Sequence, residues 1–199
     1  MSARESDRWG HAMTITGTVR LAAIVYQAGF HVDDFLTRVA NLLSADHVRL
    51  GGAIQENSGG AAGACAAMTL IDLKSQSRIR ISQDLGSQAQ GCRLDAGGLT
   101  EFGALLDQTF DPDVEFLVLN RFGKAEAEGG GLRLAFVRAI EAGIPVVTAV
   151  RPPYTEAWSE FHAGLAIDLT PDLGAVLAWC RNAVRELRAA RRTALSPTG

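Results

Sequence analysis

The feature that most constrains how this chain folds is a short apolar run near its middle that stops abruptly at polar residues. Residues 116–119 are Phe, Leu, Val and Leu. Such a run is typical of a strand buried on both faces, as in a parallel sheet covered by helices. Polar, charged and glycine residues follow, and then a stripe at helical spacing predicts a helix with Leu132, Ala135, Phe136, Ala139 and Ile140 on one face. The charged residues are therefore expected at the carboxyl edge of a sheet, where ligands bind in open α/β folds.

Strand and helix patterns alternate along the rest of the chain. The patterns predict strands at 18–26, 48–55, 146–150 and 165–169, and helices capped by Asp33, ending before 111, spanning 156–162 and starting at 171. Two more strand patterns, 67–73 and 78–82, are joined by only four residues. A connection this short indicates an antiparallel hairpin, serving as an extension of the sheet or as a flap. We therefore expect a three-layer α/β sandwich with a mostly parallel sheet, helices on both faces and one hairpin.

Composition adds only broad limits. A chain of 199 residues most simply forms one domain, here 17–190, between a flexible arm at 1–16 and a flexible tail at 191–199. The net charge of -3 gives no reason to expect nucleic-acid binding. No apolar run approaches the roughly 20 residues that cross a bilayer. Three widely spread cysteines and a start without a signal-peptide core predict a reduced, cytoplasmic protein.

The loop after the first strand lies where a phosphate-binding P-loop would lie. A P-loop supplies glycines, a lysine and a Ser or Thr hydroxyl for phosphate and magnesium. Residues 28–35, AGFHVDDF, contain one glycine, no lysine and two aspartates. Asp33 and Asp34 would repel a triphosphate, so ordinary Walker-type hydrolysis is not expected. Gly29 and His31 are the candidate ligand-binding residues of this loop.

The segment after the central strand predicts an anion site. Glycines let backbone N–H groups approach a ligand, and a helix N-terminus favours negative charge. The candidate binding residues are Asn120, Arg121, Gly123, Lys124, Glu126, Gly129, Gly130 and Gly131, joined by Arg151, which follows another strand at the same edge. The residues leave an alternative open, in which Arg121, Lys124, Glu126 and Glu128 form a surface ion-pair network.

The hairpin predicts a second candidate site. Cys65 precedes its first strand and Cys92 follows its second, so antiparallel pairing would bring the two thiols together. With Asp84 and Arg93 nearby, they could bind a soft metal, a molybdenum species or a redox partner. No C-x-x-C or histidine spacing supports zinc, and buried filler cysteines are the alternative. Cys180 falls on an apolar helical stripe and is predicted to be core.

Two sets of motifs resemble known families. The stretch LNRFGKAE (119–126) resembles the second motif of small bacterial and archaeal nucleoside triphosphatases, a strand ending in Asp-Glu followed by Ile-Gly-Lys-Met-Glu. Asn120 and Arg121 replace the two acids, which removes the magnesium ligand and the water activator expected from that motif. The whole chain resembles an uncharacterised bacterial family distantly related to those enzymes, through RISQDLG (80–86), GCRLD (91–95), NRFGKAEAEGGGLR (120–133) and GIPVVTAV (143–150).

This resemblance implies a degenerate P-loop NTPase-like fold and a role in molybdenum metabolism, because members of that family tend to be encoded beside molybdenum uptake and molybdoenzyme genes. With the anion site predicted from the residues, the expected ligand is a small anion: molybdate, tungstate, a phosphate group or a nucleotide with magnesium. Three functions stay open: an oxyanion- or nucleotide-binding protein, a nucleoside triphosphatase in which Glu126 orients water, and an interaction or chaperone partner for molybdoenzyme assembly or transport. A homo-oligomer also stays open.

Overall fold

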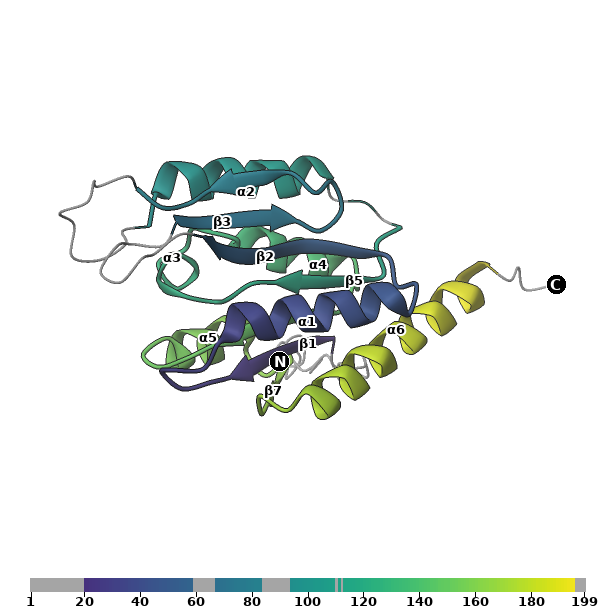
Figure 1. Ribbon diagram of the computed structural model, residues 1–199. Helices are drawn as coiled ribbons and strands as arrows, with labels where there is room; N and C mark the ends of the chain where they lie inside the picture. The colour runs from purple at the N-terminus through teal and green to yellow at the C-terminus, as the bar shows by residue number, and fades with distance from the viewer. Residues whose placement is uncertain (1–19, 59–66, 84–93, 110, 112, 196–199) are drawn as a thin grey trace, which may run out of the picture.

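Seven strands form a single sheet in the part of the chain that the computed structural model describes, namely residues 20–58, 67–83, 94–109, 111 and 113–195 (Figure 1). Their order across the sheet is β4-β3-β2-β5-β6-β1-β7. The strands are β1 (Leu21–Val25), β2 (Leu50–Ser58), β3 (Ala67–Asp72), β4 (Arg78–Arg80), β5 (Phe116–Leu119), β6 (Val146–Val150) and β7 (Ala166–Leu169).

The sheet is parallel except at one end. β2, β5, β6, β1 and β7 pair in parallel, whereas β3 pairs antiparallel with both β2 and β4. The predicted mostly parallel sheet with an antiparallel hairpin is therefore confirmed, and the hairpin extends the sheet. β2 runs to Ser58, three residues past its predicted end at Gln55, because its pairing with β3 continues to the register Ser58–Ala67 after β5 has ended.

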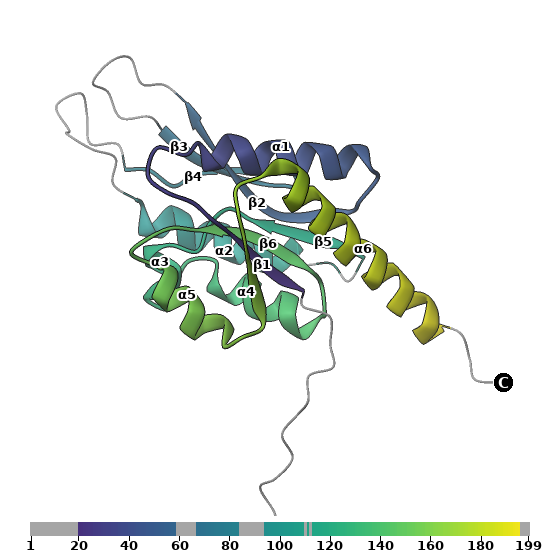
Figure 2. The same cartoon turned by 90° about the horizontal axis from the view of Figure 1, so that it is seen from below.

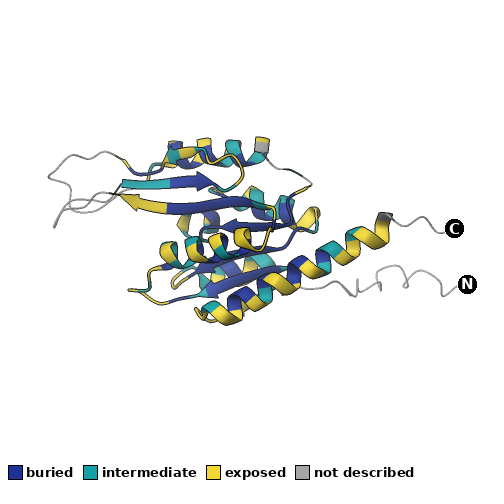
Figure 3. Ribbon diagram, turned by 45° about the vertical axis from the view of Figure 1, so that its right-hand side comes forward, coloured by how far each residue is buried: buried dark blue, intermediate teal, exposed yellow. Residues whose placement is uncertain are grey.

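Helices cover both faces of this sheet (Figures 1 and 2). One face packs α1 (Val32–Ala45) and α6 (Leu173–Leu195), and the other packs α2 (Ala96–Thr109), α4 (Arg133–Glu141) and α5 (Thr155–His162). β5 contributes to both cores: Phe116 and Val118 belong to the α1–α6 cluster, and Leu117 and Leu119 belong to the opposite one. The prediction of a central strand buried on both faces is confirmed, and Figure 3 shows buried strand segments in the middle of the molecule and helices with exposed outer faces.

An aromatic cluster fixes the chain where it leaves β5. The ring centroid of Phe122 lies 5.2 Å from that of Trp158 and 5.3 Å from that of Phe161, both on α5. Phe136 of α4 completes the cluster at 6.1 Å from Phe122. Because Phe122 is buried, the polar residues on either side of it are held at the sheet edge. The short helix α3 (Lys124–Ala127) follows directly.

The structure bears on four further sequence predictions; it confirms the one for Cys180 and differs from the other three. Asp33 is not the cap of α1, because the helix begins at Val32 and its cap position, His31, makes no side-chain cap bond. Ile140, predicted on the buried stripe of α4, is exposed one residue before that helix ends. Cys180 is core as predicted, and burial raises the pKa of its thiol to about 12. The predicted tail at 191–199 overlaps α6, which continues to Leu195.

The predicted arm at 1–16 lies outside the described residues. Within the described part of the chain, none of the helices combines the length and apolarity needed to cross a membrane.

Candidate functional site

The carboxyl edge of the parallel strands gathers loops from distant parts of the chain. Asn120 and Arg121 directly follow β5, Arg151 directly follows β6, and the loop after β1 leads to α1. Backbone pairing holds the ends of these strands together, since the Tyr26 N–H donates to the Val150 carbonyl at 3.1 Å and Phe122 bridges Val150. Topology therefore places side chains from three strand ends next to one another.

Asp33 is the centre of a polar network at this edge. Its Oδ1 accepts a hydrogen bond from Asn120 Nδ2 at 3.2 Å and forms an ion pair with the Arg121 guanidinium. Its Oδ2 accepts from Asn57 Nδ2 at 2.8 Å. Asn120 Oδ1 in turn accepts the backbone N–H of Gln55 at 3.3 Å. The carboxylate that was predicted to cap α1 instead ties α1 to the ends of β2 and β5.

The Glu126 carboxylate accepts hydrogen bonds from the backbone around it. The side chain is buried, its Oε2 accepts the Gly123 N–H at 2.9 Å, and its Oε1 accepts the Leu132 N–H at 2.9 Å. Gly131 has φ +58, and a Cβ there would lie 2.1 Å from Glu126 Oε1, so a larger residue would be strained and would displace this carboxylate. The negative charge favoured at the start of α4 is therefore supplied by the chain's own carboxylate.

The glycine run after α3 does not join the other predicted residues. The N–H of Gly129 donates to the Glu126 carbonyl at 3.2 Å, and that of Gly130 donates to the Ala125 carbonyl at 2.8 Å. Gly130 and Gly131 line a separate cavity of about 420 Å³ between α2 and α4. These donors close the turn between α3 and α4, so they are not directed at the residues that follow β5.

The four charged residues of the alternative surface network are also separated. Lys124 pairs with Glu128 at 3.7 Å, an exposed contact between residues four apart on the chain. Arg121 pairs with Asp33, whereas Glu126 binds backbone N–H groups. Among the residues described, only the Lys124–Glu128 pair of that network is formed.

Two adjoining cavities open at the carboxyl edge. The first, of about 250 Å³, is lined by Asn120, Arg121, Gly123, Lys124 and Glu126 and by an apolar wall from β3, α2 and the chain after β4. The second, of about 270 Å³, is lined by Gly29 and His31 of the loop after β1 and by Asp33 and Asp34 of the first turn of α1. Tyr26, Arg121 and Arg151 line both cavities. The structure thus brings together every predicted ligand-binding residue except Gly129–Gly131.

The cations at these cavities are incompletely neutralised. Arg121 pairs with Asp33, but its Nε is buried without a hydrogen-bond partner in the described part of the chain. Arg151 is exposed, and its guanidinium has no ion pair with any described residue. Asp33 and Asp34 add negative charge to the second cavity, whereas the one acid of the first, Glu126, is engaged by backbone donors. The first cavity is therefore the more favourable place for an anion.

The residue that directly follows β5 is not available to hold a magnesium ion. Magnesium in proteins is held mainly by carboxylates and water. Asn120 stands directly after β5, and both ends of its amide are engaged by Gln55 and Asp33. Over residues 20–58, 67–83, 94–109, 111 and 113–195, no group of three or more His, Cys, Asp or Glu could hold a metal ion. The predicted pair Cys65 and Cys92 lies outside the described residues.

Sequence reasoning missed the residues that organise this edge. Gln55 and Asn57 hold the network, but they follow an apolar run much as many surface residues do. The available signal was that Gln55 ends a predicted strand and Asn57 lies two residues beyond it, since polar residues there reach the carboxyl edge. Tyr26 ends the predicted strand 18–26 and Tyr154 closely follows the predicted strand 146–150, but neither is among the ligand-binding residues predicted from sequence, although both line the first cavity.

Comparison with known proteins gives matches in sequence and in fold. The model of a family described as "Protein of unknown function (DUF2478)" matches residues 21–179. The "Molybdenum import ATP-binding protein ModC 2" of Bradyrhizobium diazoefficiens is 37% identical over 172 residues, which are 86% of this chain and 19% of that protein. The chain therefore spans about a fifth of the length of this relative.

Two solved structures share the fold. THEP1 from Aquifex aeolicus superposes with a TM-score of 0.58 at 12% identity, covering 80% of this chain and 98% of its own. A human cancer-related nucleoside triphosphatase superposes with a TM-score of 0.55 at 14% identity, covering 90% of this chain and 100% of its own. At these identities the likeness concerns the fold alone, which is the α/β fold of these two proteins.

Proposed function

The chain belongs to the DUF2478 family, and on that premise we propose that it binds an oxyanion group at the carboxyl edge of its sheet, in molybdenum metabolism. The ligands under this proposal are molybdate, tungstate or the phosphate group of a larger molecule. The observation that carries the proposal is that Arg121 and Arg151 line both edge cavities, while Arg151 has no ion pair with a described residue. A planar guanidinium donates paired hydrogen bonds that match the oxygens of a tetrahedral oxyanion.

The link to molybdenum rests on the sequence relative. That protein is named for molybdenum import and ATP binding, and its matching segment is 37% identical to this chain. Because the chain spans only 19% of that protein, ATP-dependent import is not carried over as an activity. The shared segment supports a role beside molybdenum handling, in which an oxyanion is the natural ligand.

Binding is better supported than hydrolysis of a nucleoside triphosphate. Hydrolysis with Glu126 as the water-orienting group would require its carboxylate to release the Gly123 and Leu132 N–H groups. Asn120 supplies no carboxylate after β5, and residues 28–35 contain no lysine. Each of these features removes a group that phosphoryl transfer uses for charge stabilisation or water positioning.

Isothermal titration calorimetry tests the proposal directly. The folded full chain is titrated with molybdate, tungstate, inorganic phosphate, ATP and GTP, and binding of at least one of them is expected. Arg121→Ala and Arg151→Ala should each weaken that binding by about tenfold or more, because each removes a charge-assisted contact. Arg185→Ala, which removes an exposed arginine of α6, is the matched control and should leave the affinity unchanged. Absence of binding to the folded protein, or unchanged affinity in Arg151→Ala, overturns the proposal.

A further inference from the structure

The first edge cavity has an apolar wall that an inorganic oxyanion would not use. Met68 and Leu70 of β3, Ile81 after β4 and Leu99 of α2 line it, together with Leu94. Leu94 is 42% exposed, so part of this wall is in contact with water. Molybdate and phosphate offer only oxygens, so neither gains from contact with these side chains.

The apolar wall and the cations belong to different ends of the same cavity. Met68 lies on β3, which is two strands away from β5 in the sheet order, whereas Arg121 and Lys124 follow β5 and Arg151 follows β6. A ligand that fills this cavity therefore meets apolar side chains at the hairpin end and positive charge at the β5–β6 end. Such a ligand carries an anionic group on an apolar body.

Aromatic residues lie among the other lining groups. Tyr26, Phe122 and Tyr154 all line the cavity. Aromatic side chains favour contact with a second ring by stacking or edge-to-face packing. At about 30 Å³ of liquid volume per water molecule, a cavity of about 250 Å³ has room for one compact ring system.

We propose that the ligand of this site is a small aromatic phosphate monoester, with its ring in the apolar part of the first cavity and its phosphate at Arg121 and Arg151. This inference rests on the proposed oxyanion function and names the class of molecule that carries the oxyanion. Asp33 and Asp34 in the second cavity direct the phosphate toward the first cavity by charge repulsion. The neighbouring Lys124 adds a third cation on the same side.

The test compares two probes that share one anionic group, namely phenyl phosphate and inorganic phosphate, by calorimetry on the full chain. Phenyl phosphate should bind about tenfold tighter or better, because its ring leaves water for an apolar wall. Leu94→Ser removes part of that wall at an exposed position, and Met68→Phe fills part of the cavity. Each should lower the ratio of the two affinities at least about fivefold. Ile140→Ser, an exposed apolar residue of α4 outside this cavity, is the matched control and should keep the ratio.

The possible outcomes separate this inference from the function on which it rests. Equal affinity for the two probes, with phosphate binding that is lost in Arg151→Ala, overturns the aromatic class and leaves oxyanion binding standing. A preference for phenyl phosphate that survives both Leu94→Ser and Met68→Phe overturns the assigned cavity. No binding of either probe, together with no binding of molybdate, overturns both proposals.

Discussion

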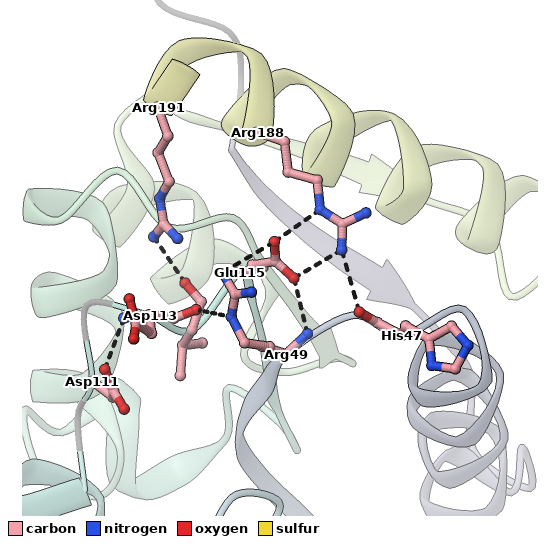
Figure 4. Close-up of polar contacts among 8 residues, drawn as sticks. His47, Arg49, Asp111, Asp113, Glu115, Arg188 and Arg191 are labelled. Carbon is pink, nitrogen blue, oxygen red and sulfur yellow. Dashed lines mark hydrogen bonds and ion pairs between the residues drawn. The ribbon is translucent and has the colours of Figure 1, made fainter. Parts of the chain in front are cut away.

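The two edges of the central sheet both carry arginine–carboxylate contacts, and they differ in how completely the charges are paired. At the amino edge, Glu115 directly precedes β5 and is 3% exposed. Arg188 of α6 donates to both of its oxygens, at 2.8 and 2.9 Å, and the Arg49 N–H donates at 3.1 Å (Figure 4). The Arg49 guanidinium lies 3.3 Å from the same carboxylate. Arg191 also reaches this edge and donates to the Val114 carbonyl at 2.9 Å.

At the carboxyl edge the arginines are paired with acids less completely. One carboxylate, Asp33, pairs with Arg121, and Arg151 has no ion pair with a described residue. Both arginines line open cavities. At the amino edge two guanidinium groups contact one buried acid and join α6, β2 and β5, whereas at the carboxyl edge Arg151 contacts no acid among the described residues. Saturated charges hold the fold together, and unsaturated charges beside a cavity are available to a ligand.

The largest expected effect on stability comes from removing the Glu115 charge at the amino edge. Glu115→Gln should lower the free energy of unfolding by about 3 kcal/mol, because it breaks a buried pair and turns an amide N–H₂ toward arginine donors. Urea denaturation at pH 7 measures this loss. Asp113→Asn removes the same charge two residues away at an exposed position and should change stability by less than about 0.5 kcal/mol. Equal losses in the two variants would contradict the assignment of Glu115 as a saturated structural charge.

Lowering the pH should remove the stabilisation that the Glu115 carboxylate provides. Hydrogen bonds from Arg188, and next the N–H of Arg49, lower the pKa of Glu115 from its ordinary 4.5 to about 2, against the opposing effect of burial. Its stabilisation is therefore complete above pH 4.5 and is lost as the pH falls toward 2. The difference in unfolding free energy between wild type and Glu115→Gln should shrink from about 3 kcal/mol at pH 7 to near zero at about pH 2. Urea titrations at pH 7, 5, 4, 3 and 2 follow this trend, and a constant difference would refute it.

Glu126 is expected to behave like Glu115, although it lies near the ligand cavities. Glu126→Gln keeps one oxygen acceptor but turns an amide N–H₂ toward one of the two buried N–H donors of Gly123 and Leu132. A loss of about 2 kcal/mol in unfolding free energy is expected, because a buried donor is left unsatisfied. Glu128→Gln, an exposed acid two residues away, is the control and should cost less than about 0.5 kcal/mol. A stable Glu126→Gln variant with altered ligand turnover would instead identify Glu126 as a reacting group.

The difference between the edges also explains what could be predicted from sequence. The buried strand Phe116–Leu119 and the hairpin were predictable, because apolar runs and loop length are local properties. The contact of Asp33 with Asn120 joins residues 87 apart, and that of Arg188 with Glu115 joins residues 73 apart. No local pattern separates these acids from surface acids. The cluster of cations after β5 and β6 was predictable, because strand ends share an edge, but which acids neutralise them depends on packing between helices and sheet.

The smallest effect should come from Asp33, the acid that pairs with Arg121 at the carboxyl edge. Asp33→Asn keeps a side chain that can accept from Asn57 but removes the ion pair with Arg121. Stability should fall by no more than about 1 kcal/mol, because Asp33 and Arg121 both remain partly in contact with water. Oxyanion affinity should rise severalfold, since Arg121 no longer divides its charge between an internal acid and the ligand. Asp34→Asn removes an equal charge from the same turn of α1 without freeing Arg121, so calorimetry should find a smaller gain for it. Equal gains would mean that the site responds only to net charge, and the contrast between paired and unpaired arginines would then carry no functional meaning.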